Sequence, residues 1–327
     1  MASNNAPIAD DRRWMTSAIA LSARGRGLTA PNPNVGCVVI RDGRVLGRGW
    51  TQPGGRPHAE AHAIAPAGDI AGATLYVTLE PCAHASARGA ACADLIAEAL
   101  PARVVIAVRD PDPRTDGKGM ERLRAAGIGV ISDVEAAAAQ RAMAGFLTRQ
   151  AKGRPHVTLK LAVSLDGRIA LPDGSSRWIT GPAARAHAHL ERARHEMILV
   201  GRGTLEADRP RLDVRLPGLE ARSPRRAVFG HGDPPEGWTA IRDPQAIGAL
   251  DGVDHLFVEG GAGTAAAFLQ ADLVDRLLLY TAPIVVGSGR GAIGDIGLAD
   301  LAHAHDRWRL CDTRTLGSDR LAIYERV

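Results

Sequence analysis

The chain has 327 residues, of which 45% are hydrophobic and 23% charged, as is usual for globular proteins with buried cores. This length favours two domains, and no apolar run is long enough to span a bilayer. The 40 basic and 36 acidic residues nearly balance and form no polybasic stripe, which argues against nucleic-acid binding. The N-terminus shows no export signal, so we expect a cytoplasmic protein whose four cysteines bind a metal or lie buried rather than form disulfides.

The first half of the chain alternates short apolar strands with helices. Apolar residues at helical spacing predict a helix over 10–24, and Asp42-Gly43 between two apolar runs predicts a β-hairpin over 35–50. Further strands are expected at 75–79 and 104–108, and further helices from about 58 and over 92–100, 120–126 and 134–148. A hairpin followed by strand–helix units predicts a mixed sheet covered by helices on both faces.

A polar segment over 150–155 predicts a linker, so we expect two domains, 1–150 and 151–327. The second half again alternates strands with helices, which predicts another α/β domain. Its strands are expected at 156–163, 197–200, 227–229, 255–258 and 277–280, its helices at 182–194 and 264–270, and a C-terminal hairpin over 308–324.

The strongest chemical signal is a His-Ala-Glu triplet followed by two cysteines. His58, Cys82 and Cys92 are a normal ligand set for zinc, and three protein ligands leave the fourth position to the water that a catalytic site needs. Zinc lowers the pKa of that water to about 7, and Glu60 is placed to move protons beside the metal. The pattern is typical of the zinc base deaminases, although nine residues rather than two separate the cysteines.

Two more histidines lie in the same neighbourhood of the sequence. We expect His62 to pack behind the site, whereas His84 could face a substrate. If either histidine completed a set of four ligands, the metal would be structural and the protein a zinc-stabilised interaction module.

Eight segments, in order along nearly the whole chain, resemble one family. The segments TAPNPNVG (29–36), PHAEAHA (57–63), YVTLEPC (76–82) and RDPDP (109–113) resemble the deaminase half of the bifunctional riboflavin-biosynthesis deaminase/reductases. Four further segments resemble the reductase half: LKLAVSLDG (159–167), SRWIT (176–180), VGRGTLEAD (200–208) and VEGG (258–261). The resemblance implies a cytidine-deaminase-like three-layer α/β/α domain followed by a dihydrofolate-reductase-like α/β domain.

The resemblance also implies the reactions. The first domain would use zinc-bound hydroxide to deaminate 2,5-diamino-6-(5-phosphoribosylamino)pyrimidin-4-one, and the second would use NADPH to reduce the ribosyl side chain to ribityl. The partner would then be a small phosphorylated pyrimidine, with no nucleic acid and no membrane, and the chain could form a homo-oligomer.

The family's functional residues can be carried over position by position. Glu60 would be catalytic, and His58, Cys82 and Cys92 would hold one zinc ion per chain. The substrate-binding residues would be Asn32, His84, Arg88, Asp110, Asp112, Ser176, Arg192, Asp208, Leu212, Arg215 and Glu259. The cofactor-binding residues would be Lys160, Ala162, Trp178, Thr180, Thr204, Asp208, Gly260 and Gly261.

Two features among these positions are also notable without the resemblance. Lys160 lies within an apolar strand in a chain with few lysines, so its side chain points away from Leu159 and Leu161. Gly260-Gly261 follows a strand and opens a helix, an arrangement that suits phosphate, although an ordinary turn has the same pattern.

The chain departs from the family at several positions, and these leave alternatives open. Asp112 stands where the family has Asn, Arg209 and Asp213 are unusual, and the 216–254 stretch is short. A deaminase whose reductase domain is only a scaffold therefore stays an alternative. A nucleoside or nucleic-acid deaminase is a second one, although 5 Trp, 3 Tyr and 4 Phe are few for a strand-binding groove.

Overall fold

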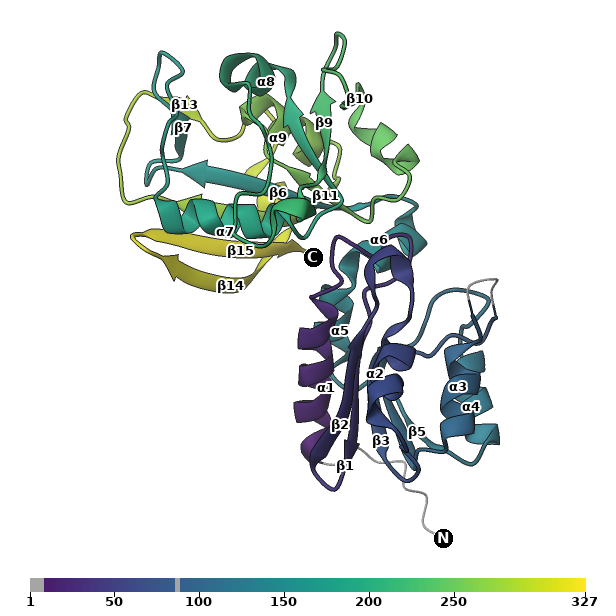
Figure 1. Ribbon diagram of the computed structural model, residues 1–327. Helices are drawn as coiled ribbons and strands as arrows, with labels where there is room; N and C mark the ends of the chain where they lie inside the picture. Colours follow the sequence, from purple (N-terminus) through teal and green to yellow (C-terminus); the bar gives the residue numbers. More distant parts are fainter. Residues whose placement is uncertain (1–8, 86–88) are drawn as a thin grey trace. The chain divides into compact units, whose positions relative to one another are not determined.

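The computed structural model describes residues 9–85 and 89–327. The chain divides into two compact units, Met1–Lys152 and Gly153–Val327, each of which has its own sheet (Figure 1). Within the described ranges, no helix combines the length and the apolar character needed to cross a bilayer.

The first unit contains one five-stranded sheet and six helices within its described residues. The strands are β1 (Gly36–Arg41), β2 (Arg44–Trp50), β3 (Thr74–Leu79), β4 (Arg103–Val108) and β5 (Gly129–Ile131). The helices are α1 (Ala9–Ser22), α2 (Ala59–Ala67), α3 (Cys92–Ala99), α4 (Lys118–Ala125), α5 (Ala136–Ala142) and α6 (Ala144–Lys152). A 3₁₀ turn covers Pro53–Gly55.

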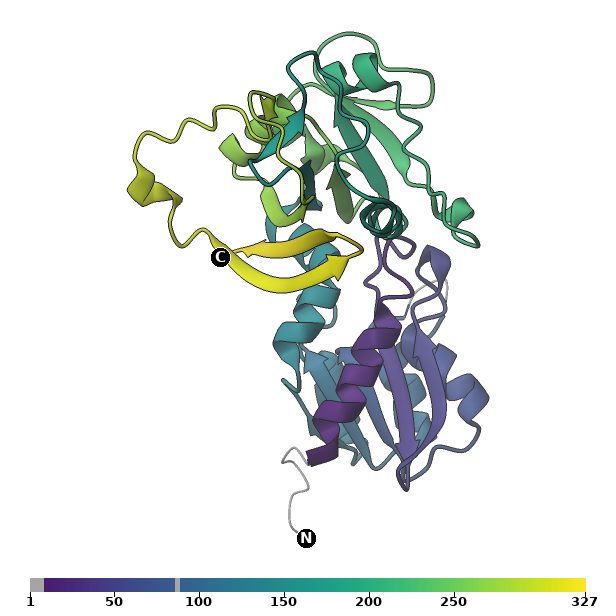
Figure 2. The same cartoon turned by 90° about the vertical axis from the view of Figure 1, so that its left-hand side faces the viewer.

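The sheet of the first unit is mixed, as predicted. Its order is β2-β1-β3-β4-β5, with β1 antiparallel to both neighbours and β3, β4 and β5 parallel. Helices α1 and α5 cover one face, and α2, α3 and α4 lie on the other (Figures 1 and 2). Residues of the central strands β1, β3 and β4 are almost all buried, so the sheet is a rigid support for the loops at its ends.

Two glycines let a helix lie directly on the edge of this sheet. A Cβ on Gly47 would lie 2.0 Å from the carbonyl oxygen of Ala63, and one on Gly49 would lie 2.1 Å from that of Ala59. Both carbonyls belong to α2, so the lack of a side chain at these two positions of β2 allows α2 to lie close to the sheet. The start of α2, where His58 and Glu60 lie, is thereby positioned.

Most elements of the first unit were predicted, and one helix was wrong. The hairpin turns at Asp42-Gly43, where both residues have positive φ, as expected for this pair. The single helix expected over 134–148 is two helices, because Met143 leaves helical backbone angles and buries its side chain in the core. Helix α6 runs on to Lys152, so half of the expected linker is helical, and the short strand β5 was not foreseen.

The second unit contains an eight-stranded sheet, a small two-stranded sheet and three helices. The strands are β6 (His156–Val163), β7 (Arg168–Ala170), β8 (Met197–Gly201), β9 (Arg225–Phe229), β10 (Thr239–Ile241), β11 (His255–Val258), β12 (Val274–Thr281), β13 (Arg290–Gly291), β14 (Trp308–Leu316) and β15 (Asp319–Arg326). The helices are α7 (Pro182–Arg192), α8 (Arg202–Asp208) and α9 (Ala262–Gln270). Further 3₁₀ turns cover Glu220–Arg222, Pro244–Ala249 and Leu301–Ala304.

The large sheet has the order β10-β9-β8-β11-β6-β12-β15-β14. Strands β10 to β12 in this order are parallel, and the β14–β15 hairpin extends them antiparallel. One face packs against α9 through Phe268 and Leu159, and the other packs against α7 through Ala188 and Leu278. Because β8, β11 and β6 are neighbours, the segments that follow them meet at one edge of the sheet.

The strands β6 and β11 have the predicted bounds, and the C-terminal hairpin is confirmed. Helix α8 and strands β7, β10 and β13 were not foreseen, because short segments with glycine or charged residues carry little periodic signal.

Candidate functional site

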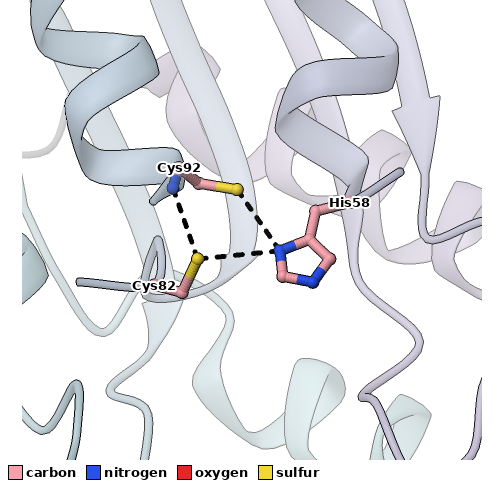
Figure 3. Close-up of side chains that lie close together, drawn as sticks. All are labelled: His58, Cys82 and Cys92. Carbon is pink, nitrogen blue, oxygen red and sulfur yellow. Dashed lines mark hydrogen bonds between the residues drawn. The ribbon is translucent and has the colours of Figure 1, made fainter. Parts of the chain in front are cut away.

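Three side chains from separate elements of the first unit meet at one point (Figure 3). His58 immediately precedes α2, Cys82 follows β3, and Cys92 is the first residue of α3. His58 Nδ1 lies 3.3 Å from Cys92 Sγ and 3.7 Å from Cys82 Sγ, and the Cys92 backbone N–H donates to Cys82 Sγ over 3.3 Å. All three ligand atoms lie within 4.8 Å of one another.

The two thiols of this cluster hold their protons unequally. The hydrogen bond from the Cys92 thiol to the Cys82 sulfur lowers the pKa of Cys82 to about 4 against the opposing effect of burial. The same contact, together with burial, raises the pKa of Cys92. Burial lowers the pKa of His58, but its hydrogen bond with Cys82 and the charges nearby outweigh burial and raise it. The contact between the two thiols therefore favours ionisation of Cys82 over that of Cys92.

Glu60 lies beside the cluster, in the first turn of α2. Its side chain is buried, and burial raises its pKa to about 7, while the charge of His58 acts in the opposite direction. A hydrogen bond with Cys92 places the carboxylate against one of the three converging groups. An acid in this position can gain or lose a proton near neutral pH.

The donor set and its spacing fit a zinc ion. The distances of 3.3 and 3.7 Å from the imidazole nitrogen to the two sulfurs match the edges, about 3.5 Å long, of a tetrahedron around zinc. Over the described residues, these three side chains form the one group of His, Cys, Asp and Glu close enough to share an ion. Neither His62 nor His84 belongs to that group, so the idea of a four-ligand structural site gains no support.

The predicted neighbours of the cluster have separate contacts. Asn32 Nδ2 donates to the carbonyl of Gly55 over 3.0 Å and lies 3.2 Å from His58 Nε2, which places Asn32 next to a ligand. His62 packs edge-on against the ring of Trp50, as expected for a residue behind the site. His84 is half-buried, and its Nδ1 lies 3.5 Å from Thr115 Oγ1.

The loop after β4 holds the two predicted aspartates, and only one of them is buried. Asp110 accepts a hydrogen bond from the Asp112 N–H over 3.0 Å, and burial raises its pKa to about 6. The Asp112 carboxylate is paired with Arg114, which lowers the pKa of Asp112. Arg88, predicted to bind substrate, lies outside the described residues.

A second group of predicted residues meets in the second unit: Lys160 lies within β6, Glu259 directly follows β11, and Arg192 is the last residue of α7. Arg192 donates to both carboxylate oxygens of Glu259 over 2.6 and 3.0 Å, and Lys160 Nζ lies 3.6 Å from the same carboxylate. Burial raises the pKa of Glu259, but the charges of Arg192 and Lys160 outweigh burial and lower it to about 2. The strand alternation expected for Lys160 is correct, since Leu159 and Leu161 pack on the opposite face.

Arg215 lies next to this group and borders a pocket of about 500 Å³. Its guanidinium contacts Asp213 Oδ1 at 3.1 Å and His189 Nε2 at 3.3 Å. The Asp213 carbonyl accepts from Arg192 over 3.0 Å, which links Arg215 to the Glu259 cluster through one backbone position. Arg211 pairs with the Asp213 carboxylate, so this carboxylate lies between two arginines.

The remaining predicted residues of the second unit lie on its loops and helix starts. Trp178 is 65% exposed, and the Arg185 guanidinium lies 4.9 Å from its ring centroid while donating to the Thr180 carbonyl. The Asp208 carbonyl accepts from Arg177 over 2.8 Å. Ser176, which directly precedes Arg177, is half-buried.

Glycines allow close packing where β11 turns into α9. A Cβ on Gly260 would lie 2.4 Å from that of Thr264, and one on Gly261 would lie 3.4 Å from Thr204 Oγ1. The turn therefore brings bare backbone next to α8. Two other predicted residues, Ala162 and Leu212, pack with the hydrophobic cluster under α7, and Leu212 is buried there.

Sequence reasoning gave no role to Glu80 or His189, and the structure shows both in contact with predicted residues. Glu80 accepts the backbone N–H of Asp110, and His189 contacts Arg215. The available signals were positional, because Glu80 directly precedes Pro81-Cys82 and His189 lies one helical turn before Arg192.

Comparison with known families matches each unit to one domain type. Residues 8–108 match the cytidine and deoxycytidylate deaminase zinc-binding region, and residues 155–237 and 247–322 match the RibD C-terminal domain. Together, the fold, the His/Cys cluster and these matches define a bifunctional enzyme with a deaminase domain and a reductase domain.

Full-length relatives and solved structures agree with this assignment. The riboflavin biosynthesis protein RibD of Escherichia coli is 38% identical over 94% of this chain and 97% of its own length, and that of Aquifex aeolicus is 34% identical over 97% and 98%. A Thermotoga maritima structure described as a diaminohydroxyphosphoribosylaminopyrimidine deaminase/5-amino-6-(5-phosphoribosylamino)uracil reductase superposes with a TM-score of 0.87 at 32% identity, covering 97% of this chain and 99% of that one. Acinetobacter baumannii RibD gives 0.84 at 33% identity and the same coverage. The chain belongs to the RibD family of riboflavin-biosynthesis deaminase/reductases.

Proposed function

We propose that the first unit, Met1–Lys152, deaminates 2,5-diamino-6-(5-phosphoribosylamino)pyrimidin-4-one and that the second unit, Gly153–Val327, reduces the product with NADPH. The likeness to the Thermotoga maritima protein supports this substrate, because both chains align over nearly their full length. The observation that carries the deaminase proposal is the convergence of His58, Cys82 and Cys92 beside buried Glu60.

His58 Nδ1 and the sulfurs of Cys82 and Cys92 would hold one zinc ion per chain. A zinc ion in a three-ligand site supplies Lewis acidity that lowers the pKa of a water molecule to about 7. Burial of both cysteines would keep bulk solvent from the metal ligands. Asn32, which lies against the other ring nitrogen of His58, would orient that imidazole and face the substrate.

Glu60 would move the proton. It would take one from the attacking water and deliver one to the amino group that leaves as ammonia, so that one residue is base and then acid. His84, Arg88 and the loop with Asp110 and Asp112 would bind the pyrimidine and its ribose phosphate, because His84 and this loop are joined through Thr115 next to Cys82.

In the second unit, NADPH would supply the hydride, and the protein would supply positions and charges. The bare backbone at Gly260 and Gly261, beside Thr204, is a suitable cradle for the cofactor's phosphates. Lys160, Ala162, Trp178, Thr180 and Asp208 would complete the cofactor site.

The substrate would bind beside the cofactor. Arg215 borders the open pocket and is half exposed, so it would bind the ribose phosphate, for which a guanidinium fork is suited. Arg192 holds Glu259 in its ionised form, and that carboxylate would accept hydrogen bonds from the sugar hydroxyls. Ser176, Asp208 and Leu212 would line the same place.

A coupled assay with the diaminopyrimidinone phosphate and NADPH tests both halves. Ammonia release follows the first unit, and the loss of NADPH absorbance follows the second. Zinc content of about one ion per chain and ammonia release without NADPH are expected. Ammonia release with no NADPH oxidation, and no NADPH-induced rise in the melting temperature, would instead support a reductase domain that serves only as a scaffold.

A further inference from the structure

A buried carboxylate two residues before Cys82 ties together three parts of the first unit. Glu80 is 2% exposed and lies just after the end of β3. Its Oε2 accepts hydrogen bonds from the backbone N–H groups of Asp110 over 3.2 Å and Gly117 over 3.0 Å. Its Oε1 accepts from the N–H of Met120 over 3.1 Å. One side chain thus fixes the loop after β4 and the first turn of α4.

The same loop also contacts the chain on the other side of Cys82. Thr115 is fully buried, and its hydroxyl accepts a hydrogen bond from the Ala83 N–H over 3.4 Å. The loop therefore contacts the chain both before Cys82, through Glu80, and after it, through Ala83. Cys82 lies in a segment that is held at both ends by one loop.

Helix α4 extends this connection to the second cysteine. A Cβ on Gly119 would lie 2.1 Å from the carbonyl oxygen of Pro81, so the first turn of α4 sits directly on the residue before Cys82. Arg122 of α4 donates to Asp94 over 2.7 Å, and Asp94 lies in the first turn of α3, which starts with Cys92. A chain of contacts thus runs from the Glu80 carboxylate through α4 to the helix that starts with Cys92.

We propose that Glu80 is a positioning residue that fixes Cys82 and Cys92 at the spacing one tetrahedral ion requires. This inference rests on the metal role proposed above for the two cysteines. Three backbone N–H donors converge on the two carboxylate oxygens of Glu80, and both oxygens act as acceptors. A glutamine has one oxygen and one NH₂ group at its end, so at least one backbone donor would face that NH₂ group in either orientation. An amide therefore cannot replace the acid at this position. Loss of a group that supports a metal ligand usually weakens metal binding by about 10- to 100-fold.

The test is Glu80→Gln in the full chain. We expect its zinc dissociation constant, measured by competition with a chelator, to rise about 10- to 100-fold at an unchanged circular dichroism spectrum. The absorption bands of cobalt bound in place of zinc should shift, because they report the geometry of the two sulfur ligands. Glu98→Gln is the matched control: it removes the same charge from an exposed position on α3, and both readouts should stay as in the unsubstituted protein.

Thr115→Val is a second, milder variant, which keeps the shape of the side chain but removes the hydroxyl that accepts from the Ala83 N–H and contacts His84 Nδ1. It should weaken zinc binding in the same direction by a smaller factor, and it keeps the test usable if Glu80→Gln does not fold. Zinc affinity and cobalt spectra that stay unchanged in the folded variants would overturn the inference and leave the deaminase proposal standing. A lack of zinc binding by the unsubstituted protein would contradict the metal role itself, and with it the inference.

Discussion

The two units hold their candidate sites by different means. In the first unit, three ligand atoms from α2, α3 and the end of β3 meet within 4.8 Å, and the groups that position them are backbone amides and small residues. In the second unit, Lys160, Arg192 and Glu259 are held by one another's charges. The spacing of the first arrangement fits a metal ion, whereas the second already pairs its own charges.

Two buried acids show the consequence. Burial, together with the charges of Asp112 and Glu80, raises the pKa of Asp110 in the first unit to about 6, whereas two cations lower the pKa of Glu259 in the second unit to about 2. A buried acid therefore costs stability in one unit at neutral pH and contributes it in the other. Substitutions that act on one unit only should separate these effects.

Removing a metal ligand should have the largest effect and should leave the other unit working. We expect Cys92→Ser to lose bound zinc and all measurable ammonia release, because the two remaining ligands cannot form a three-ligand site. NADPH oxidation with the deaminated substrate should stay within about twofold, since Cys92 belongs to the first unit. Cys311→Ser, at an exposed position of the second unit, is the control and should change neither rate.

Changing the proton carrier should separate chemistry from metal binding. Glu60→Gln keeps the shape of the side chain but cannot move a proton, so ammonia release should fall about 10²- to 10⁴-fold. Zinc content should stay as in the unsubstituted protein, because Glu60 lies outside the group of three ligand atoms. The measurement is the rate of ammonia release beside metal analysis, with exposed Glu121→Gln as control. Full activity of Glu60→Gln would exclude this residue as the proton carrier.

How far the sequence predicts each site follows from the same difference. The convergence of His58, Cys82 and Cys92 could be predicted, because these residues lie within 35 positions, two of them lie at helix starts, and their chemistry is narrow. Lys160 could be placed on the correct face of β6 from strand alternation alone. Patterns of this kind are local, and a sequence displays them directly.

The partners of these residues could not be predicted. Glu80 accepts amides from Asp110, Gly117 and Met120, which are 30 to 40 positions away, and such backbone contacts leave no trace in residue types. The Arg192–Glu259 pair joins residues 67 positions apart in a chain rich in arginine. The prediction of one continuous helix over 134–148 was wrong for a related reason, since burial of Met143 in the core overrides the helical pattern.

Breaking the charge cluster of the second unit should destabilise that unit and leave the first unchanged. Arg192→Met removes the closer of the two cations that pair with the buried Glu259 carboxylate, Lys160 at 3.6 Å being the other. This loss should cost about 3 to 5 kcal/mol at neutral pH. Urea unfolding measures the loss, and hydrogen exchange over β11 and α7 assigns it to the second unit. Equal protection of β11 in the variant and the unsubstituted protein would contradict this role of the pair.

The same pair predicts the acid response of the second unit. The folded-state pKa of Glu259, about 2, lies below its ordinary value of 4.5, so the contribution is complete above pH 4.5 and is lost as the pH falls through about 2. The loss should be on the order of 3 kcal/mol, and Arg192→Met should lack most of it. Urea titrations at decreasing pH measure how the free energy of unfolding falls in the unsubstituted protein and in Arg192→Met.

Asp110→Asn should change the free energy of unfolding in the opposite direction, and its effect should be the smallest of those predicted. The folded-state pKa of Asp110, about 6, lies above its ordinary value of 3.8, so its contribution is fully present below pH 3.8 and is lost as the pH rises through about 6. An amide keeps the acceptor for the Asp112 N–H and removes the buried charge, so the first unit should gain about 1 to 3 kcal/mol at neutral pH.

The same variant tests whether Asp110 binds the pyrimidine. If it does, the KM for ammonia release should rise, because the carboxylate that lowers stability is also needed for substrate binding. Asp69→Asn, at an exposed position, is the control for both readouts. A neutral-pH stability that falls in Asp110→Asn would mean that the carboxylate has a partner whose attraction exceeds its cost of burial.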